Sequence, residues 1–209
     1  MTIFKHSIMS FINLCNQIFD ESVKDYHKTD DVDTAIINRY EFKTIEYYLY
    51  LKNWIDTVQW HLEDIIRNPQ IDPVEALALK RRIDSSNQDR TDLVELIDSY
   101  FLDQNKAVEP KIDATINTES PAWAIDRLSI LHLKIYHMQQ EVDRKDSSAD
   151  HMQQCKTKLN ILLEQKVDLS TAIHQLIEDI STGNKKMTVY KQMKMYNDPA
   201  LNPVLYGNK

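Results

Sequence analysis

Apolar residues recur three and four positions apart over five long stretches of the chain, a spacing that places them on one face of a helix. The stretches run from about Ile3 to His27, Thr34 to Arg67, Asp72 to Leu102, Ser120 to Lys145 and Ala149 to Gly183. In the fifth stretch the apolar positions alternate four and three apart, as they do in a coiled coil. The pattern therefore predicts five long helices, followed by a short C-terminal helix and an extended tail.

Local signals support several of these boundaries. Asp72-Pro73 and Ser120-Pro121 each combine a capping residue with a first-turn proline, and Gly183 stands where a helix would end in a left-handed residue. The periodicity fails between about 103 and 119, which predicts one long loop, and the tail covers about 184–209. No internal repeat and no domain boundary is visible, so we expect a single helical domain over residues 1–209.

Composition agrees with an all-α fold. The 209 residues include only 2 glycines, whereas 42% are apolar and 27% charged. Sheets and tight hairpins need glycine at turns with positive φ, so a chain nearly without it is expected to be helical.

The net charge and the cysteines limit which binding partners and which cellular compartment are expected. A net charge of -7 argues against nucleic-acid binding through bulk electrostatics. No run approaches the roughly 18 apolar residues of a membrane span, and the N-terminal stretch is interrupted by Lys5 and His6, so we interpret it as a helix and not a signal. Cys15 and Cys155 are isolated thiols, as in a reducing cytosol. We therefore expect a cytoplasmic protein without a transmembrane segment.

On the second helix, polar residues border the apolar face. A helical rotation of about 100° per residue places His61 and Asp64 beside the core. The same rotation points Lys52, Asp56 and Glu63 away from it.

The third and fourth helices also carry polar residues at inward positions. Asn87 and Arg90 interrupt the apolar stripe of the third helix, and burial of each polar group costs about 2–7 kcal/mol without a partner. Asp84 and Asp98 are the expected partners of Arg90. On the fourth helix a polar stripe comprises Asp126, Ser129, His132 and Tyr136.

Two interpretations of these residues stay open: a hydrogen-bonded network that fixes helix register, or a ligand pocket between helices. The candidate catalytic residues are His61, Asp64, Arg90 and His132. The candidate ligand-binding residues are Asn87, Arg90, Asp126, Ser129 and Tyr136. His61 and Asp64 are spaced to share a metal ion, with His132 or His137 as a third ligand. A lone histidine on an apolar face is more often a hydrogen-bonded core residue, so no metal site is predicted.

Four segments carry a family resemblance: WHLEDIIR, KRRIDSSNQDR, PAWAIDRLSILHLKIYHM and YKQMKMYNDPALNPVLY. Together they resemble the bacterial domain-of-unknown-function family DUF4254, from the second helix onward. The resemblance implies a single-domain helical protein, sometimes associated with cell-envelope glycan genes. It implies no activity, cofactor or catalytic residue.

Two classes of function follow. In the first, the polar interior is a pocket for a small anionic metabolite such as a sugar nucleotide, with His61 as general base or metal ligand and Arg90 as anion clamp. In the second, the chain is a non-catalytic interaction protein whose helices dock a partner or a second copy, and the polar residues are structural. The sequence identifies no cofactor and does not decide between enzyme and binding protein.

Overall fold

The computed structural model describes residues 3–190 and 199–201, with side chains from residue 11 onward. Within these residues it is helical and has no strand, which confirms the all-α prediction. The five long helices are α1 (Ile3–Tyr26), α2 (Ile45–Ile66), α3 (Pro73–Gln104), α4 (Pro121–Asp143) and α5 (Ala149–Ser181).

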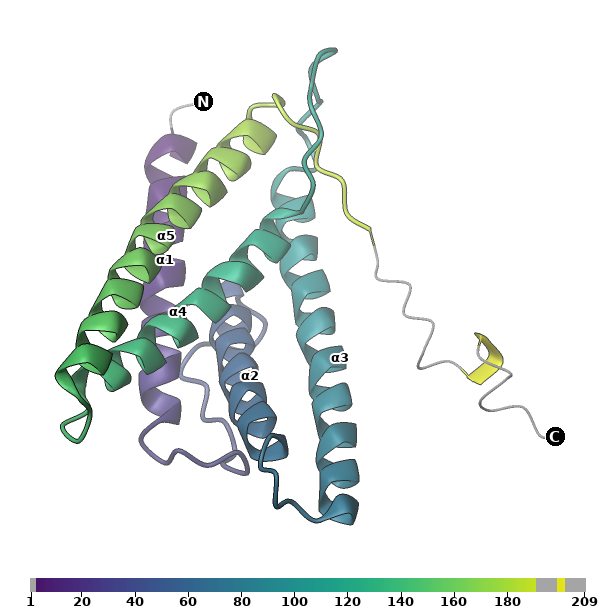
Figure 1. Cartoon of the computed structure of the whole chain (residues 1–209). Coiled ribbons are helices and arrows are strands. Elements are labelled where there is room, and N and C mark those ends of the chain that lie inside the picture. The colour runs from purple at the N-terminus through teal and green to yellow at the C-terminus, as the bar shows by residue number, and fades with distance from the viewer. Residues whose placement is uncertain (1–2, 191–198, 202–209) are drawn as a thin grey trace.

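Helix α4 lies at the centre of the packing. It contacts each of the other four long helices, and it crosses obliquely between α5 and α3 (Figure 1). Helix α1 also packs against α2 and α5, and α2 packs against α3. The largest fully buried apolar side chains come from α1 to α4: Ile12, Ile18, Phe19, Leu49, Leu62, Ile97, Ile125, Leu128 and Leu133.

Side-chain caps explain where four of the helices begin. Thr44, Asp72, Ser120 and Ser148 each accept a hydrogen bond from a backbone N–H of the following turn. These bonds satisfy donors that have no partner inside the helix. The predicted starts at Asp72, Ser120 and Ala149 are thus accurate to about one residue.

The predicted start of the second helix at Thr34 is wrong. Residues 34–44 form a loop, and α2 begins only after the Thr44 cap. Within the loop Asn38 bonds backbone groups of Tyr40 and Tyr47, and the side chain of Tyr40 donates to Glu21 on α1. Such side-chain bonds offer the backbone an alternative to the helix.

The long loop between α3 and α4 is tied to the segment that follows α5. Lys111 N donates to Gly183 O at 2.9 Å, and Lys186 N donates to Thr115 O at 2.9 Å. Gly183 has φ +74°, and a Cβ there would lie 2.8 Å from the carbonyl oxygen of Glu109. The glycine therefore serves both as the left-handed residue that ends the helix and as the site of a close backbone approach.

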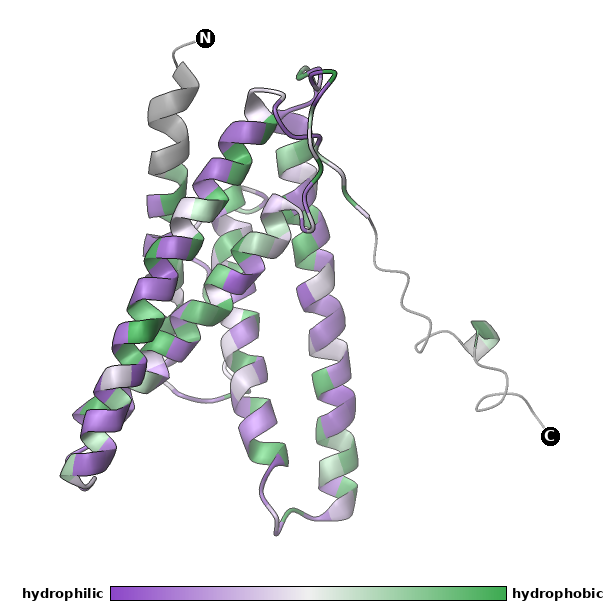
Figure 2. Cartoon of the chain, turned by 45° about the horizontal axis from the view of Figure 1, so that its top comes forward, coloured by the Kyte–Doolittle hydropathy of each residue, from purple (hydrophilic) through white to green (hydrophobic). Residues whose placement is uncertain are grey.

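Hydrophilic and hydrophobic residues are interleaved along all the long helices (Figure 2). Among the described residues, none of the helices has a stretch apolar enough and long enough to span a membrane. The expected short C-terminal helix and extended end belong to the tail of about 184–209, of which residues 191–198 and 202–209 lie outside the described residues. Between these two segments the structure has one 3-10 turn, η1 (Pro199–Leu201).

Candidate functional site

Four charged side chains meet between α2, α3 and α4. Lys52 Nζ lies 2.5 Å from Asp56 Oδ2 and 2.7 Å from Asp126 Oδ1. Arg90 Nε lies 2.6 Å from Asp56 Oδ1, and its Nη2 lies 3.2 Å from Asp126 Oδ1. Two cations thus share two carboxylates. We call Lys52, Asp56, Arg90 and Asp126 the charge cluster.

The charge cluster is buried to different depths. The side chains of Lys52 and Asp56 are 0% and 1% exposed, whereas that of Arg90 is 21% exposed. Burial works against the charge of Arg90, but the two carboxylates outweigh it and raise the pKa of its guanidinium. Arg90 therefore carries its charge at a solvent-accessible edge of the cluster.

Neutral polar groups complete the hydrogen bonding around the charge cluster. Ser129 Oγ donates to Asp56 Oδ2 at 2.6 Å, and Asn53 Nδ2 donates to Ser129 Oγ at 3.0 Å. Asn87 Oδ1 accepts from Gln59 Nε2 at 2.8 Å and from Arg90 Nη1 at 3.4 Å. The structure thus brings together four of the predicted ligand-binding residues: Asn87, Arg90, Asp126 and Ser129.

Two expectations about charge placement are wrong. Lys52 and Asp56 do not point away from the core. Both are buried. Helices α1, α3 and α4 cover α2, so the middle of α2 has no side that is fully exposed to solvent. Asp84 and Asp98 do not pair with Arg90.

Both acids have other partners. Asp84 forms an exposed ion pair with Lys80. Asp98 accepts from Ser120 Oγ at 2.8 Å and from Ala122 N at 3.3 Å, so it holds the start of α4. Burial raises the pKa of Asp98, although these two hydrogen bonds oppose the shift.

A cavity of about 240 Å³ opens beside the charge cluster. It is lined by Asp56, Gln59, Trp60, Glu63, Asp64, Arg67, Arg90, Ile130 and Leu133. Three carboxylates and two guanidiniums therefore face one space that also has an aromatic and aliphatic wall.

At the rim of this cavity, Asp64 is 57% exposed and lies 3.2 Å from Arg67. The expectation that Asp64 faces the core is therefore wrong. Glu63, expected to be solvated, is 37% exposed and also pairs with Arg67, at 3.4 Å.

His132 lies apart from the charge cluster. Its ring nitrogens contact Asp20 Oδ1 at 2.7 Å and Asn16 Oδ1 at 2.8 Å, both on α1. Burial lowers the pKa of His132, although the carboxylate of Asp20 opposes the shift. His132 therefore joins α4 to α1, and it does not line the cavity.

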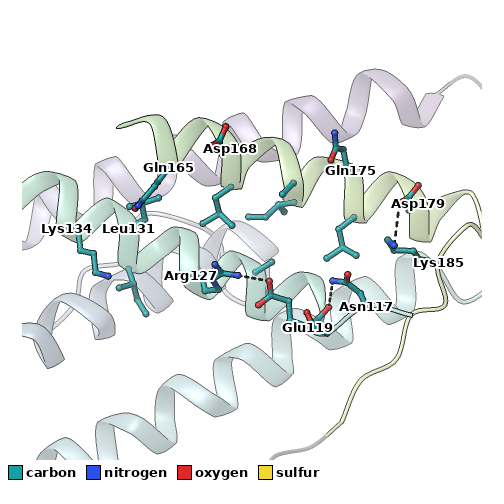
Figure 3. A pocket seen from close by; sticks show the side chains of 17 residues that line it. Asn117, Glu119, Arg127, Leu131, Lys134, Gln165, Asp168, Gln175, Asp179 and Lys185 are labelled. Carbon is teal, nitrogen blue, oxygen red and sulfur yellow. Dashed lines mark hydrogen bonds and ion pairs between the residues drawn. The ribbon is translucent and has the colours of Figure 1, made fainter. Parts of the chain in front are cut away.

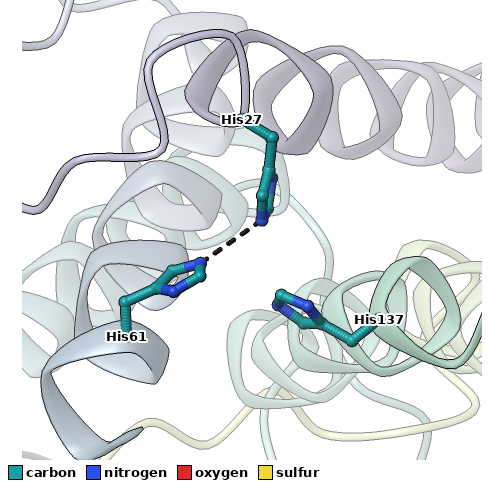
Figure 4. Close-up of side chains that lie close together, drawn as sticks. All are labelled: His27, His61 and His137. Atoms are coloured by element: carbon teal, nitrogen blue, oxygen red, sulfur yellow. Dashed lines mark hydrogen bonds between the residues drawn. The ribbon is translucent and has the colours of Figure 1, made fainter. Parts of the chain in front are cut away.

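His61 and Tyr136 belong to a third group. His61 Nε2 lies 3.3 Å from His27 Nε2, and the ring of Tyr136 lies 4.2 Å from that of His27. His137 completes this group, with ring centroids 5.2 Å from His27 and 5.4 Å from His61. The three imidazoles come from the end of α1, from α2 and from α4, and they point toward one another (Figure 4). The predicted site residues thus divide among three places.

Sequence reasoning missed Lys52, Asp56 and His27. A signal existed for the first two, because Lys52 and Asp56 are opposite charges four residues apart in a helix that also carries Asn53 and Thr57. No such signal existed for His27, which follows the last residue of α1 and is placed by the turn there.

Acidification is expected to destabilise the fold. Burial is the main cause that lowers the pKa of His27, His132 and His137 below the ordinary 6.5. Below about pH 6.5 the unfolded chain binds protons that the folded chain does not yet bind, so the stability present above that pH is lost as pH falls. Urea unfolding at pH 7.5 and 5.5 checks this: the midpoint should be lower at pH 5.5. A midpoint that is equal or higher at pH 5.5 contradicts the expectation.

The fold and these contacts define a class: a helical protein with paired charges in its interior and a small polar cavity beside them. The chain belongs to the family described as "Protein of unknown function (DUF4254)", whose model matches residues 46–189. The match covers α2 to α5, so Asn16, Asp20 and His27 lie outside it. No curated protein and no solved structure matches the chain.

Proposed function

We infer that this chain is a cytoplasmic protein that binds a small hydroxyl-bearing metabolite, the sugar ring of a free or nucleotide-linked sugar, in the cavity beside the charge cluster. The observation that carries this function is that the cavity opens onto Asp56, Arg90 and Trp60 together. Small-molecule sites combine an apolar wall with a few fixed polar groups in this way.

The size of the cavity favours one ring. Its 240 Å³ corresponds to about eight water volumes, at roughly 30 Å³ per water. The indole of Trp60 lines the cavity and supplies an apolar surface for the C–H groups of a sugar ring. Carboxylates and guanidiniums offer paired acceptors and donors to adjacent hydroxyls.

The charges refine the expected ligand. Arg90 is already shared by two carboxylates, so its capacity to clamp an anion is largely used. Arg67 at the rim is 66% exposed, and within the described part of the chain its ion pairs are with Glu63 and Asp64. A neutral ring inside the cavity, with any phosphate outside near Arg67, therefore fits better than an anion on Arg90.

Ligand-observed NMR with glucose, N-acetylglucosamine and their uridine diphosphate derivatives tests the proposal. Trp60→Ala should weaken binding about tenfold or more, since stacking of a nucleobase on an aromatic side chain contributes roughly 1–3 kcal/mol and we expect a contribution near the lower end for a sugar ring. Gln165→Ala is the matched control: Gln165 is exposed on α5 and does not line this cavity, so binding should be unchanged. Absence of binding by every probe, or equal binding by the Trp60 variant, contradicts the proposal.

One observation favours the alternative of a non-catalytic interaction protein. Helix α5 exposes the apolar residues Ile161, Leu163 and Val167, with 66% exposure at Val167. Separately, a groove of about 940 Å³ runs between α4 and α5, with polar residues such as Arg127, Gln165 and Asp168 along it (Figure 3). Under this alternative α5 docks a partner or a second copy of the chain, and the charge cluster serves stability alone.

A further inference from the structure

The three imidazoles of His27, His61 and His137 have the spacing of metal ligands. One ligand atom from each lies within 4.8 Å of the other two. The nearest pair, Nε2 of His27 and Nε2 of His61, is 3.3 Å apart. With zinc–nitrogen bonds of about 2.0–2.1 Å and tetrahedral angles, two coordinated nitrogens lie about 3.3 Å apart. The first pair therefore already has the required separation.

Hydrogen bonds to the far side of two rings leave the near side free to act as ligand. His27 Nδ1 lies 2.7 Å from the carbonyl oxygen of Val23, an acceptor that requires a donor at Nδ1. His137 Nδ1 similarly contacts Gln140 Oε1 at 3.1 Å. In a neutral imidazole each arrangement leaves a lone pair on Nε2. A partner behind the ring is the usual way in which a protein orients a histidine ligand.

The Nε2 of His137 has no hydrogen-bond partner although it is buried. A buried acceptor without a partner costs roughly 1–3 kcal/mol, so the atom calls for an explanation. A metal ion among the three histidines would satisfy it.

Aromatic neighbours hold two of the rings in fixed orientations. Tyr26 stacks on His61 with ring centroids 5.2 Å apart, and Trp60 stacks on His137 at 4.9 Å. These contacts restrain His61 from α1 and His137 from α2.

A carboxylate stands at the open side of the cluster. Asp30 Oδ1 lies 3.6 Å from His61 Nε2 and 3.9 Å from His27 Nε2, and its side chain is 60% exposed. Its backbone is held in the left-handed region, with φ 54°, and its N–H donates to Tyr26 O at 3.0 Å. An oxygen ligand, from Asp30 or from a water molecule that it holds, would complete the four positions of a zinc site.

We propose that His27, His61 and His137 bind one divalent zinc ion, with the carboxylate of Asp30 or a water molecule held by it in the fourth position. The donor set of three imidazole nitrogens and one oxygen suits zinc, and one exchangeable oxygen position resembles a catalytic centre more than a closed structural site. None of the three histidines lines the sugar cavity, although Trp60 both lines that cavity and stacks on His137, so the two sites share one side chain.

Zinc titration of the chelator-stripped full chain tests the site. The readouts are bound zinc by mass spectrometry and affinity by competition with a chromophoric chelator. The wild-type chain should bind one equivalent. His61→Ala and His137→Ala should each weaken binding by about 100-fold or more, because even the loss of a group behind a ligand costs 10–100-fold. His61→Gln, which keeps a polar side chain of similar length, gives a second variant should the alanine variant fail to fold.

His151→Ala is the matched control. His151 lies with Glu141 and Cys155 in another group of metal-binding side chains, with His151 Nε2 2.9 Å from Glu141 Oε2. The His151 variant should bind zinc as the wild type does. The proposal is overturned if the wild-type chain binds no zinc, if His151→Ala alone abolishes binding, or if the folded His61 and His137 variants bind as tightly as the wild type. Sugar binding measured in the presence of chelator keeps this test separate from that of the proposed function.

Discussion

Lys52→Ala is expected to lower the free energy of unfolding by about 3–5 kcal/mol, the usual cost of breaking a buried ion pair. The ammonium group lies between Asp56 and Asp126 and is fully buried. Its removal leaves Arg90 as the one cation beside two carboxylates that water reaches poorly. Most of the expected loss comes from leaving a buried carboxylate charge without a compensating cation, and less of it from the lost attraction between Lys52 and its partners.

Urea unfolding followed by circular dichroism measures the effect. Lys52→Met separates charge from packing, because it keeps an unbranched side chain and should lose nearly as much stability. Lys80→Ala is the control: Lys80 pairs with Asp84 at the surface, where such pairs contribute about 0–1 kcal/mol. A loss below 1 kcal/mol for both Lys52 variants would contradict this expectation. It would show that removal of the ammonium group does not leave an uncompensated buried charge.

Arg90→Ala is expected to cost about 2–3 kcal/mol, less than the loss at Lys52. The guanidinium bonds Asp56, Asp126 and Asn87, but it borders the cavity and is partly exposed. In the variant, water that enters the cavity can solvate part of the carboxylates of Asp56 and Asp126, which lose the guanidinium. The same urea experiment measures the loss, with the exposed Arg82→Ala as control. A loss equal to that of Lys52→Ala contradicts the expectation that water in the cavity solvates the carboxylates in place of Arg90.

Much of the fold was predictable because the signals are local. The capping residues Asp72 and Ser120, each followed by proline, start their helices where predicted, and Gly183 has the positive φ expected of a helix end. The start of α2 was not predictable in this way. Residues 34–44 have helical periodicity, but their side chains bond α1 through contacts such as Tyr40 with Glu21. That choice depends on a neighbour far away in the sequence.

The candidate site was predictable only where one helix carried the whole signal. Asn87 and Arg90 interrupt an apolar stripe, and the structure brings both to the charge cluster. Lys52 and Asp56 were missed because a prediction from helical rotation takes the face opposite the apolar stripe to be exposed to solvent. α2 is covered by three helices, so that assumption fails at its middle.

The histidine group could not be predicted from the pattern of any one helix. His27 is placed by a turn, and His61 and His137 lie on different helices, so no spacing along the chain joins them. The sequence offered Asp64 as the companion of His61. In the structure Asp64 pairs with Arg67 at the surface, and the companions of His61 come from α4 and from the end of α1.

We expect the polar interior to divide into two parts: the charge cluster maintains the fold, and the histidine group is free to serve as a site. Urea unfolding of Lys52→Ala and His61→Ala, side by side and in the presence of chelator, tests this division most directly. The Lys52 variant should lose about 3–5 kcal/mol, and the His61 variant about 1 kcal/mol or less, because its ring is partly exposed and makes no buried ion pair. Equal losses, or a larger loss at His61, would show that both groups are structural and would contradict the account.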